Sequence, residues 1–388
     1  MNRTLNASCF GYVTQAIVNN FAPLLFLTFR SEFGIPLSRI TLLISVNFAV
    51  QLLVDFFLAG AASKIGYRKL AVFGHVCAAL GLAGLAAFPA ALHDPTFGLL
   101  LAVIVYAVGG GVIEVIVSPI VEAIPADEGR KKSAAMSLLH SFYCWGHLFV
   151  VLCTTLFFTL FGIANWRILA VIWALLPLAN SVYFSRVPIT TLEEAQPSLP
   201  IRKLLSAKTF WLFVVLMVCA GASEQAMSQW ASVFAEAGLK VSKTVGDLAG
   251  PCVFAALMGL ARLSYSLYSE KIKLRVFMVL SAALSVCGYL LASLAPDPAL
   301  SLAGTALCGL AAGILWPGTY SLSTAAIPGG GTAMFALLAL AGDLGCSLGP
   351  GTVGAVSEAG GLKAGLAAAV IFPAVLLVCL FSLRRKRG

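Results

Sequence analysis

The sequence predicts an all-α polytopic membrane protein whose twelve transmembrane helices form two pseudo-symmetric halves of six helices each. The first observation is composition: the 388 residues are 60% hydrophobic and 11% charged, whereas soluble domains contain about 25% charged residues. The second is that apolar runs of roughly 18 or more residues, each long enough to span a bilayer, recur from end to end. The third is that motifs of the first half return in the second half at constant spacing. A lipid bilayer is therefore the first expected partner.

The apolar runs predict twelve spans. The first run is longer than the core of a secretory signal and lacks an A-x-A-like cleavage site, so we expect it to remain as the first span. In chain order the spans are expected at residues 6–29, 40–62, 70–91, 97–123, 133–161, 167–187, 209–236, 246–268, 275–295, 300–325, 332–357 and 364–383.

Basic residues are distributed unequally between the loops on the two sides of the membrane. With these spans, 18 of the 25 Lys and Arg residues lie on the side that carries both termini, and 6 lie on the other side. Because cytoplasmic loops are enriched in Lys and Arg, both termini are expected in the cytoplasm, with the protein in the plasma (cytoplasmic) membrane or cell inner membrane. This distribution also accounts for the net charge of +9, so nucleic acid is not an expected partner.

The longest connection divides the chain into two halves. Residues 188–207 contain three prolines and mixed charges, which predicts a flexible cytoplasmic linker between an N-terminal bundle, residues 1–187, and a C-terminal bundle, residues 208–388. No loop is large enough for a separate catalytic domain, so an enzyme is not expected. Most of the ten cysteines lie inside the spans, where they behave as small apolar residues, and no cofactor is expected.

Two motif pairs indicate an internal repeat. Gly111–Pro119 reads GVIEVIVSP and Gly309–Pro317 reads GLAAGILWP, with a carboxylate, Glu114, in the first copy only. Residues 11–19 and 221–229 likewise share Gly, Gln, Ala and a final amide. Both members of each pair would cross the membrane in the same direction, which is typical of transporters built from two parallel repeats.

These features resemble the major facilitator superfamily over essentially the whole chain. The segment after span two, SKIGYRK at residues 63–69, is similar to the cytoplasmic D-R-x-G-R-R signature, with Ser63 in place of the acid. A second copy at residues 270–275, EKIKLR, keeps the acid and loses the glycine. Arg262, eight residues before Glu270, matches a frequent arginine of span eight.

Within that superfamily the chain resembles the fucose permease type of proton-coupled sugar symporters. Residues 114–119, EVIVSP, are similar to the E-x-x-x-N-P motif of span four, and residues 138–146, LLHSFYCWG, to the segment that follows in span five. Glu224 with Trp230 resembles an E-x5-W pattern, whereas the acid of span one is replaced by amides. The resemblance implies alternating access, with a small-molecule substrate and a proton or other coupling cation as partners.

Three carboxylates are candidates for proton coupling. A charged residue at the centre of a span costs about 2.5 to 3.5 kcal/mol, so Glu114 is expected to be functional. It would act as a proton or ion carrier, as a hydrogen-bond acceptor for the substrate, or as the structural partner of an arginine. The other two candidates are Glu224 and Asp343. The glycine-rich run after Asp343, residues 345–354, resembles the G-P motif of drug antiporters, although small residues also permit close helix packing.

Polar and aromatic residues in the spans are candidates for substrate binding, since each side-chain amide both donates and accepts hydrogen bonds and aromatic rings stack on sugars. The candidates are Gln15, Asn19, Asn20, His140, Tyr143, Trp145, His147, Gln225, Gln229, Trp230 and Trp316. The alternative for the amides is interhelical bonding, worth about 0.6 kcal/mol per bond. The alternatives in span five are packing or a metal, but His140, Cys144 and His147 have no obvious fourth ligand, so no metal site is expected.

Asp55 and Arg262 occupy equivalent places in spans two and eight, 207 residues apart. An ion pair made in one conformation and broken in the other would give each a gating role, and the alternative is contact with substrate. The favoured function is proton-driven uptake of a small hydroxylated solute such as a monosaccharide. The alternatives are a proton-coupled exporter of drugs or amphipathic metabolites, and a non-transporting membrane receptor or scaffold.

Overall fold

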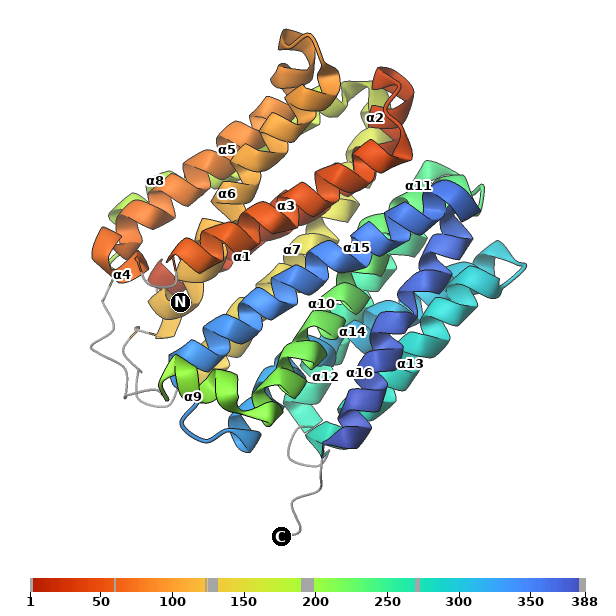
Figure 1. Ribbon diagram of the computed structural model, residues 1–388. Helices are drawn as coiled ribbons and strands as arrows, with labels where there is room; N and C mark the ends of the chain where they lie inside the picture. The colour runs from red at the N-terminus through yellow and green to blue at the C-terminus, as the bar shows by residue number, and fades with distance from the viewer. Residues whose placement is uncertain are drawn as a thin grey trace. The chain divides into compact units, whose positions relative to one another are not determined.

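The computed structural model describes residues 3–58, 61–122, 124, 132–189, 199–268 and 273–383. The chain divides into two compact units, Met1–Glu194 and Ala195–Gly388. In the described residues every regular element is a helix, as Figure 1 shows. The predicted all-α membrane fold is therefore confirmed.

The first unit contains eight α-helices and two short 3-10 turns within its described residues. They are α1 (Arg3–Asn20), η1 (Ala22–Leu25), α2 (Phe26–Phe33), α3 (Leu37–Leu58), α4 (Ala62–Ile65), α5 (Tyr67–Ala91), α6 (Pro95–Glu122), α7 (Lys132–Phe161), η2 (Ile163–Asn165) and α8 (Trp166–Arg186). The turn η1 lies where Pro23 lacks a backbone donor. Together α1, η1 and α2 make one apolar length, Arg3–Phe33, which continues past the expected end of span one.

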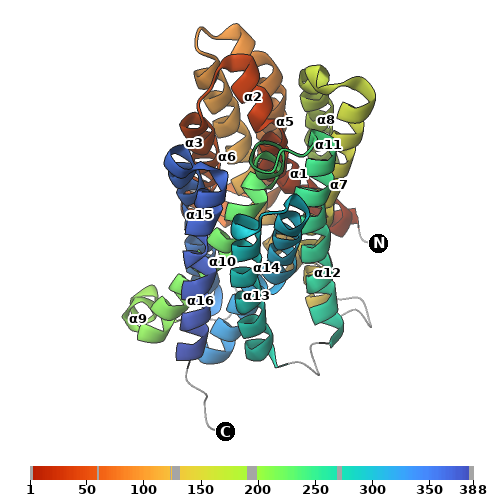
Figure 2. The same cartoon turned by 90° about the vertical axis from the view of Figure 1, so that its right-hand side faces the viewer.

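The second unit contains eight α-helices and two π-helical turns in the part that is described. They are α9 (Ile201–Ser206), α10 (Lys208–Val233), η3 (Phe234–Gly238), α11 (Lys243–Asp247), η4 (Leu248–Cys252), α12 (Val253–Tyr268), α13 (Leu274–Leu294), α14 (Pro298–Ala326), α15 (Gly331–Ala369) and α16 (Ile371–Ser382). In Figure 2, α12, α13 and α14 lie side by side, in agreement with their packing.

Eleven helical segments of the described chain are long and apolar enough to cross a membrane, and one of them accounts for the two last predicted spans. This segment, Met334–Ser382, is 49 residues long, but Gly361 interrupts its helical backbone with φ of 81°. A left-handed φ is readily adopted by glycine and ends a helix. The described chain has eleven such segments where the sequence predicted twelve spans, because the last two predicted spans are joined across Gly361. Helix α6 continues through Pro119.

The expected linker contains regular structure. Its described part includes α9, in which Leu204 is buried against the hydrophobic core of the second unit. Leu199 also donates a backbone hydrogen bond to the carbonyl of Gly329 at 2.9 Å. At this end of the segment expected to be a flexible linker, the chain is helical and packs through the apolar Leu204. Residues 190–198, with Glu193 and Glu194, lie outside the described residues, as does Glu270.

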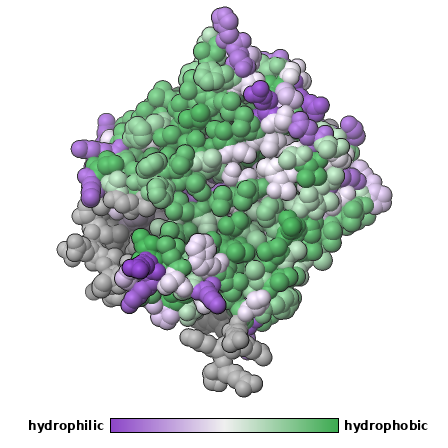
Figure 3. All heavy atoms as spheres, in the orientation of Figure 1, coloured by the Kyte–Doolittle hydropathy of each residue, from purple (hydrophilic) through white to green (hydrophobic). Residues whose placement is uncertain are grey.

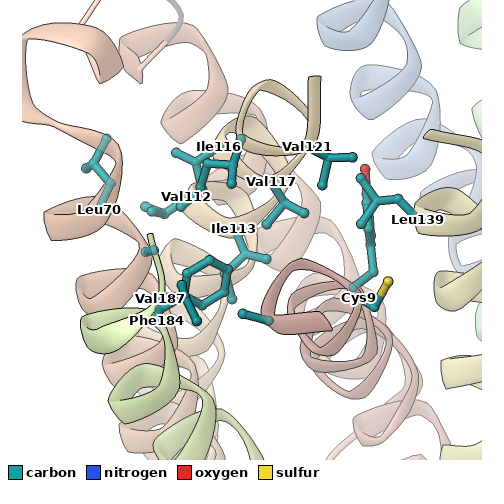
Figure 4. Close-up of a cluster of buried hydrophobic side chains, with 14 of the residues drawn as sticks. Cys9, Leu70, Val112, Ile113, Ile116, Val117, Val121, Leu139, Phe184 and Val187 are labelled. Atoms are coloured by element: carbon teal, nitrogen blue, oxygen red, sulfur yellow. The ribbon is translucent and has the colours of Figure 1, made fainter. Parts of the chain in front are cut away.

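One face of helix α6 is apolar and packs against neighbouring helices, and the polar residues of α6 lie on the other face. Val112, Ile113, Ile116 and Val117 are buried in a cluster with Cys9, Leu70, Leu139 and Phe184, drawn from α1, α5, α7 and α8 (Figure 4). Helix α5 approaches α6 closely, since a Cβ at Gly81 would lie 2.3 Å from the nitrogen of Tyr106. This packing fixes the rotation of α6 and therefore the place of Glu114.

The glycine-rich run of α15 packs against α10 in the second unit. A Cβ added to Gly345 would lie 2.0 Å from the carbonyl oxygen of Val218, and one added to Gly349 would lie 2.4 Å from that of Ala222. Neither position has room for a side chain. Of the two interpretations of residues 345–354, close helix packing is the one that these contacts support.

The outward faces of the helices are strongly apolar. Hydrophobic residues cover most of the face shown in Figure 3, and hydrophilic residues gather near its borders. On α8, for example, Ile168, Ile172, Leu175 and Val182 are all exposed. Rows of exposed aliphatic side chains on helices of spanning length are expected where lipid is the solvent.

Candidate functional site

The first unit contains a buried network of side-chain amides from α1 and α3. Gln15 and Asn19 come from α1, and Asn47 and Gln51 from α3, and all four are buried. Within each pair the residues are four apart, which places them on one helix face. Amides on these two faces hydrogen-bond to one another, so the polar face of α1 meets that of α3.

Glu114 stands at one end of this network. The Gln15 amide nitrogen Nε2 donates to Glu114 Oε2 at 2.8 Å and to Gln51 Oε1 at 2.7 Å. A carboxylate oxygen of Asp55 lies within 4.8 Å of one from Glu114. The structure therefore brings together two predicted site residues, Gln15 and Glu114, with Asp55 beside them.

The network continues from Gln51 away from Glu114. Gln51 Nε2 donates to Asn19 Oδ1 at 2.8 Å and to Asn47 Oδ1 at 3.0 Å, while Asn47 Nδ2 donates to Asn19 Oδ1 at 3.1 Å. Asn47 and Gln51 were missed by the sequence analysis. The signal was present, since residues 47, 51 and 55 are all polar, spaced by four and set in an otherwise apolar run.

These bonds bear on the two interpretations of the amides. Asn19 and Gln15 do bond between helices, as the structural interpretation expects. Asn20 differs, because its Nδ2 donates to the Ala16 carbonyl of its own helix at 2.9 Å and lies 3.5 Å from the Tyr143 hydroxyl. Their roles in substrate binding stay predictions.

The candidates of α7 do not all lie on one side of the helix. The His140 ring is 5.3 Å from the ring of Tyr12, whose hydroxyl is 3.2 Å from Ser118 Oγ. His147 is buried, whereas Trp145 is 41% exposed. Successive helix positions are about 100° apart, so Trp145 and His147, which are two positions apart, point to nearly opposite sides of α7. His147 shares the side of Tyr143, and Trp145 does not. Trp145 is therefore set apart from the other α7 candidates.

In the second unit an ion pair joins two of the predicted residues. Arg262 Nη2 lies 3.7 Å from Glu224 Oε2, and the side chains are 19% and 9% exposed. Arg262 Nε also donates to the Gly313 carbonyl at 3.2 Å. We expected Glu224 as a proton carrier and Arg262 as a gate, and the structure places them together on α10 and α12. Glu224 is thus compensated by an arginine, the role considered as an alternative for Glu114.

Amides extend this ion pair along α10. Gln225 Nε2 donates to Glu224 Oε1 at 3.3 Å, and Gln229 Nε2 donates to Gln225 Oε1 at 3.1 Å. Both units thus carry a carboxylate with amides attached to it. In the second unit Arg262 also lies beside the carboxylate.

The remaining candidates lie inside the second unit. Trp230 is fully buried, and its Nε1 donates to the Pro350 carbonyl at 3.0 Å. Its ring is packed in this structure, and its role in stacking on a sugar stays a prediction. The half-buried ring of Trp316 lies against Gly342, where a Cβ would be 2.1 Å from the ring. Asp343 follows this glycine on α15 and is buried.

Helices of spanning length with apolar outer faces define a polytopic membrane protein, and within it carboxylates are embedded among amides. The family model of the Major Facilitator Superfamily matches residues 7–350. The chain belongs to this superfamily and is a transporter, not an enzyme.

Solved structures of other transporters share the fold. A bacterial homologue of the human lysosomal transporter Spinster is 16% identical, with 97% of this chain and 95% of that chain covered and a TM-score of 0.74. A variant of the E. coli fucose:proton symporter FucP is 14% identical, with 98% of both chains covered and a TM-score of 0.68. A variant of the nucleoside transporter NupG is 14% identical, with 98% of both chains covered and a TM-score of 0.76. No curated protein sequence matches the chain.

Proposed function

We propose that this transporter takes up a small hydroxylated solute, such as a monosaccharide, together with protons. The observation that carries the proposal is the bond from Gln15 to Glu114, because it joins a titratable group to an amide expected to bind solute. A scaffold without transport has no need of a carboxylate within a span, where its burial is costly. We place the protein in the plasma membrane with both termini in the cytoplasm, and the two predicted bundles as the parts that move.

Glu114 is the proposed proton carrier. Gln15 Nε2 donates to its carboxylate, and a carboxylate oxygen of Asp55 lies within 4.8 Å of one of its own. Two carboxylates at this separation repel each other when both are ionised, which favours a proton on one of them. Glu224 instead lies 3.7 Å from Arg262, as one half of an ion pair. Asp343 remains a further proton-coupling candidate.

The chemistry of the amides supports a hydroxylated solute. Gln15, Asn19, Gln225 and Gln229 present both donors and acceptors, which is the complement of a sugar hydroxyl. Two structurally similar proteins are a fucose:proton symporter and a nucleoside transporter, and both solutes contain a sugar ring.

Proton-coupled uptake should change the pH of the medium outside the cells. Adding the right monosaccharide to energy-depleted, weakly buffered cells should make the outside medium more alkaline, because protons enter with the solute. The measurement is external pH after each member of a monosaccharide panel, with cells lacking the protein as the control. The exporter alternative predicts no such change and, in energised cells, lower accumulation of a lipophilic dye. That pair of results would overturn the proposal.

Solute contact can be tested one residue at a time. Cysteine at Gln15, Asn19, Gln225 or Gln229, in a background without reactive cysteines, should react with a small aqueous thiol reagent and be protected by the transported monosaccharide. Ala16→Cys is the matched control on α1, because Ala16 is buried against Gly146 of α7 and should stay inert. Inertness at all four amide positions would favour a purely structural role.

A further inference from the structure

We propose that Gln15, Gln51 and Asn47 transmit the charge state of Glu114 to Asn19, and so decide whether the Asn19 carbonyl oxygen accepts hydrogen bonds from the protein or from the solute. This inference rests on the proposed function, which makes Glu114 the proton carrier and Asn19 a solute contact. It gives a role to Gln51 and Asn47, which the function does not otherwise use. Gln51 is thereby a positioning residue.

The first step is the bond between Glu114 and Gln15. A hydrogen bond to an ionised acceptor is roughly twice as strong as a neutral one, so ionised Glu114 holds Gln15 Nε2 firmly at 2.8 Å. Gln15 Oε1, by contrast, is buried and accepts no hydrogen bond among the described residues. The orientation of this amide is therefore set from its nitrogen side, by Glu114 and Gln51.

The second step concerns the hydrogen bonds that the Asn19 carbonyl oxygen accepts. Because Gln15 donates to Gln51 Oε1, the nitrogen of Gln51 is directed away from Glu114 and donates to Asn19 and Asn47. Asn19 Oδ1 accepts from both Gln51 and Asn47. A carbonyl oxygen has two lone pairs, so both are used within the protein while Glu114 is ionised.

Protonation of Glu114 reverses the orientation that the Gln15 amide prefers. The added proton turns the carboxylate into a neutral acid, which weakens its attraction for Gln15 Nε2 and provides a hydroxyl donor. The unpartnered Gln15 Oε1 is an acceptor for such a donor. Once Gln15 turns, Gln51 is no longer held toward Asn19, and the lone pair of the Asn19 oxygen that accepted from Gln51 is released for a solute hydroxyl, while Asn47 can keep its own bond. Proton binding then favours solute binding, which is the sign that symport requires.

Further titratable groups lie on the helices packed against α6. Asp55 on α3 is near enough to repel the ionised form. Tyr12 on α1 meets Ser118, one turn beyond Glu114, and on α7 His140 contacts Tyr12 while Tyr143 lies near Asn20. His75 on α5 is directed elsewhere, with its ring nitrogens 2.7 Å from the Ala71 carbonyl oxygen and 2.8 Å from Asn180 Nδ2. Of these groups, Asp55 is the one whose carboxylate lies within 4.8 Å of that of Glu114.

The test needs no solute. Infrared difference spectra of the purified protein, recorded as the pH is lowered, report protonated carboxyl groups through their carbonyl stretch. Isotope-labelled asparagine separates asparagine side-chain bands from the rest. In the wild type we expect a carboxyl band together with a shift of an asparagine amide band. Glu114→Gln should abolish both, and Asn19→Leu should identify the asparagine.

The decisive variant is Gln51→Met, which keeps the shape of the side chain without its hydrogen bonds. It should retain the carboxyl band and lose the asparagine shift. Asn180→Leu is the matched control, because Asn180 is a buried amide of the same unit that bonds to Ala7 and His75 outside the network. It should retain both signals.

The outcomes separate this inference from the proposed function. An asparagine shift that persists in Gln51→Met, or a wild type that shows the carboxyl band without any asparagine shift, would overturn the transmission and leave Glu114 as proton carrier. A carboxyl band unchanged in Glu114→Gln would overturn both. The wild-type spectrum alone decides the question if Gln51→Met does not fold.

Discussion

Glu114→Gln is expected to abolish proton-driven accumulation of solute while exchange of solute across the membrane continues. The amide is close to the carboxylate in shape, but it cannot gain or lose the coupled proton. Gln15 can still donate to its oxygen, so the network that includes Asn19 is retained. We expect steady-state accumulation to fall to the level of equilibration, with counterflow exchange reduced by less than about tenfold, equivalent to 1.4 kcal/mol.

The measurement is accumulation of a radiolabelled monosaccharide in vesicles with an imposed proton gradient, followed by counterflow in the same vesicles. Two controls accompany it. Glu114→Asp keeps a titratable group and should retain some accumulation, and Asp94→Asn changes an acid in the connection between α5 and α6, outside both helices. A Glu114→Gln protein that concentrates solute as the wild type does, with the same dependence on the gradient, would remove Glu114 from coupling.

The fold was largely predictable from composition and repeat, and Glu114 could be singled out from the sequence as a candidate. A carboxylate inside an apolar run is conspicuous because its burial is costly, and Ala312 at the equivalent position of the repeat marks it further. The end of the eleventh span was also near the right place, because Gly361 adopts the positive φ that interrupts α15. These features are local, and a single sequence contains them.

The features that the sequence did not predict depend on which helices contact one another. Asn47 and Gln51 carry a regular polar spacing, but nothing in the sequence says that their face meets Gln15 and Asn19 across α1 and α3. Trp230 likewise reads as an aromatic residue beside Glu224, and its burial against Pro350 follows from the packing of α10 on α15. Contacts between segments 120 residues apart in the chain are set by packing rather than by local pattern.

Arg262→Met is expected to destabilise the protein far more than loss of an exposed ion pair, because it leaves the Glu224 carboxylate buried without its cation. Removing one partner of a buried ion pair typically costs about 3 to 5 kcal/mol. Glu224→Gln should cost less, since Arg262 keeps its bond to the Gly313 carbonyl and is partly exposed. The double variant, Glu224→Gln with Arg262→Met, should regain much of the stability lost in Arg262→Met, because no charge then remains to be compensated.

The four proteins form a double-mutant cycle, and their free energies of unfolding in detergent give the coupling between the two side chains. Arg167→Met is the matched control, because Arg167 pairs with Glu32 while both side chains are about a third exposed, and such a pair contributes about 1 kcal/mol or less. Additive effects of the Glu224 and Arg262 substitutions would show that the pair is not formed in the membrane protein. A large coupling would instead show that the two side chains stabilise each other as an ion pair, which would favour a structural role for Glu224 and leave Glu114 as the proposed proton carrier.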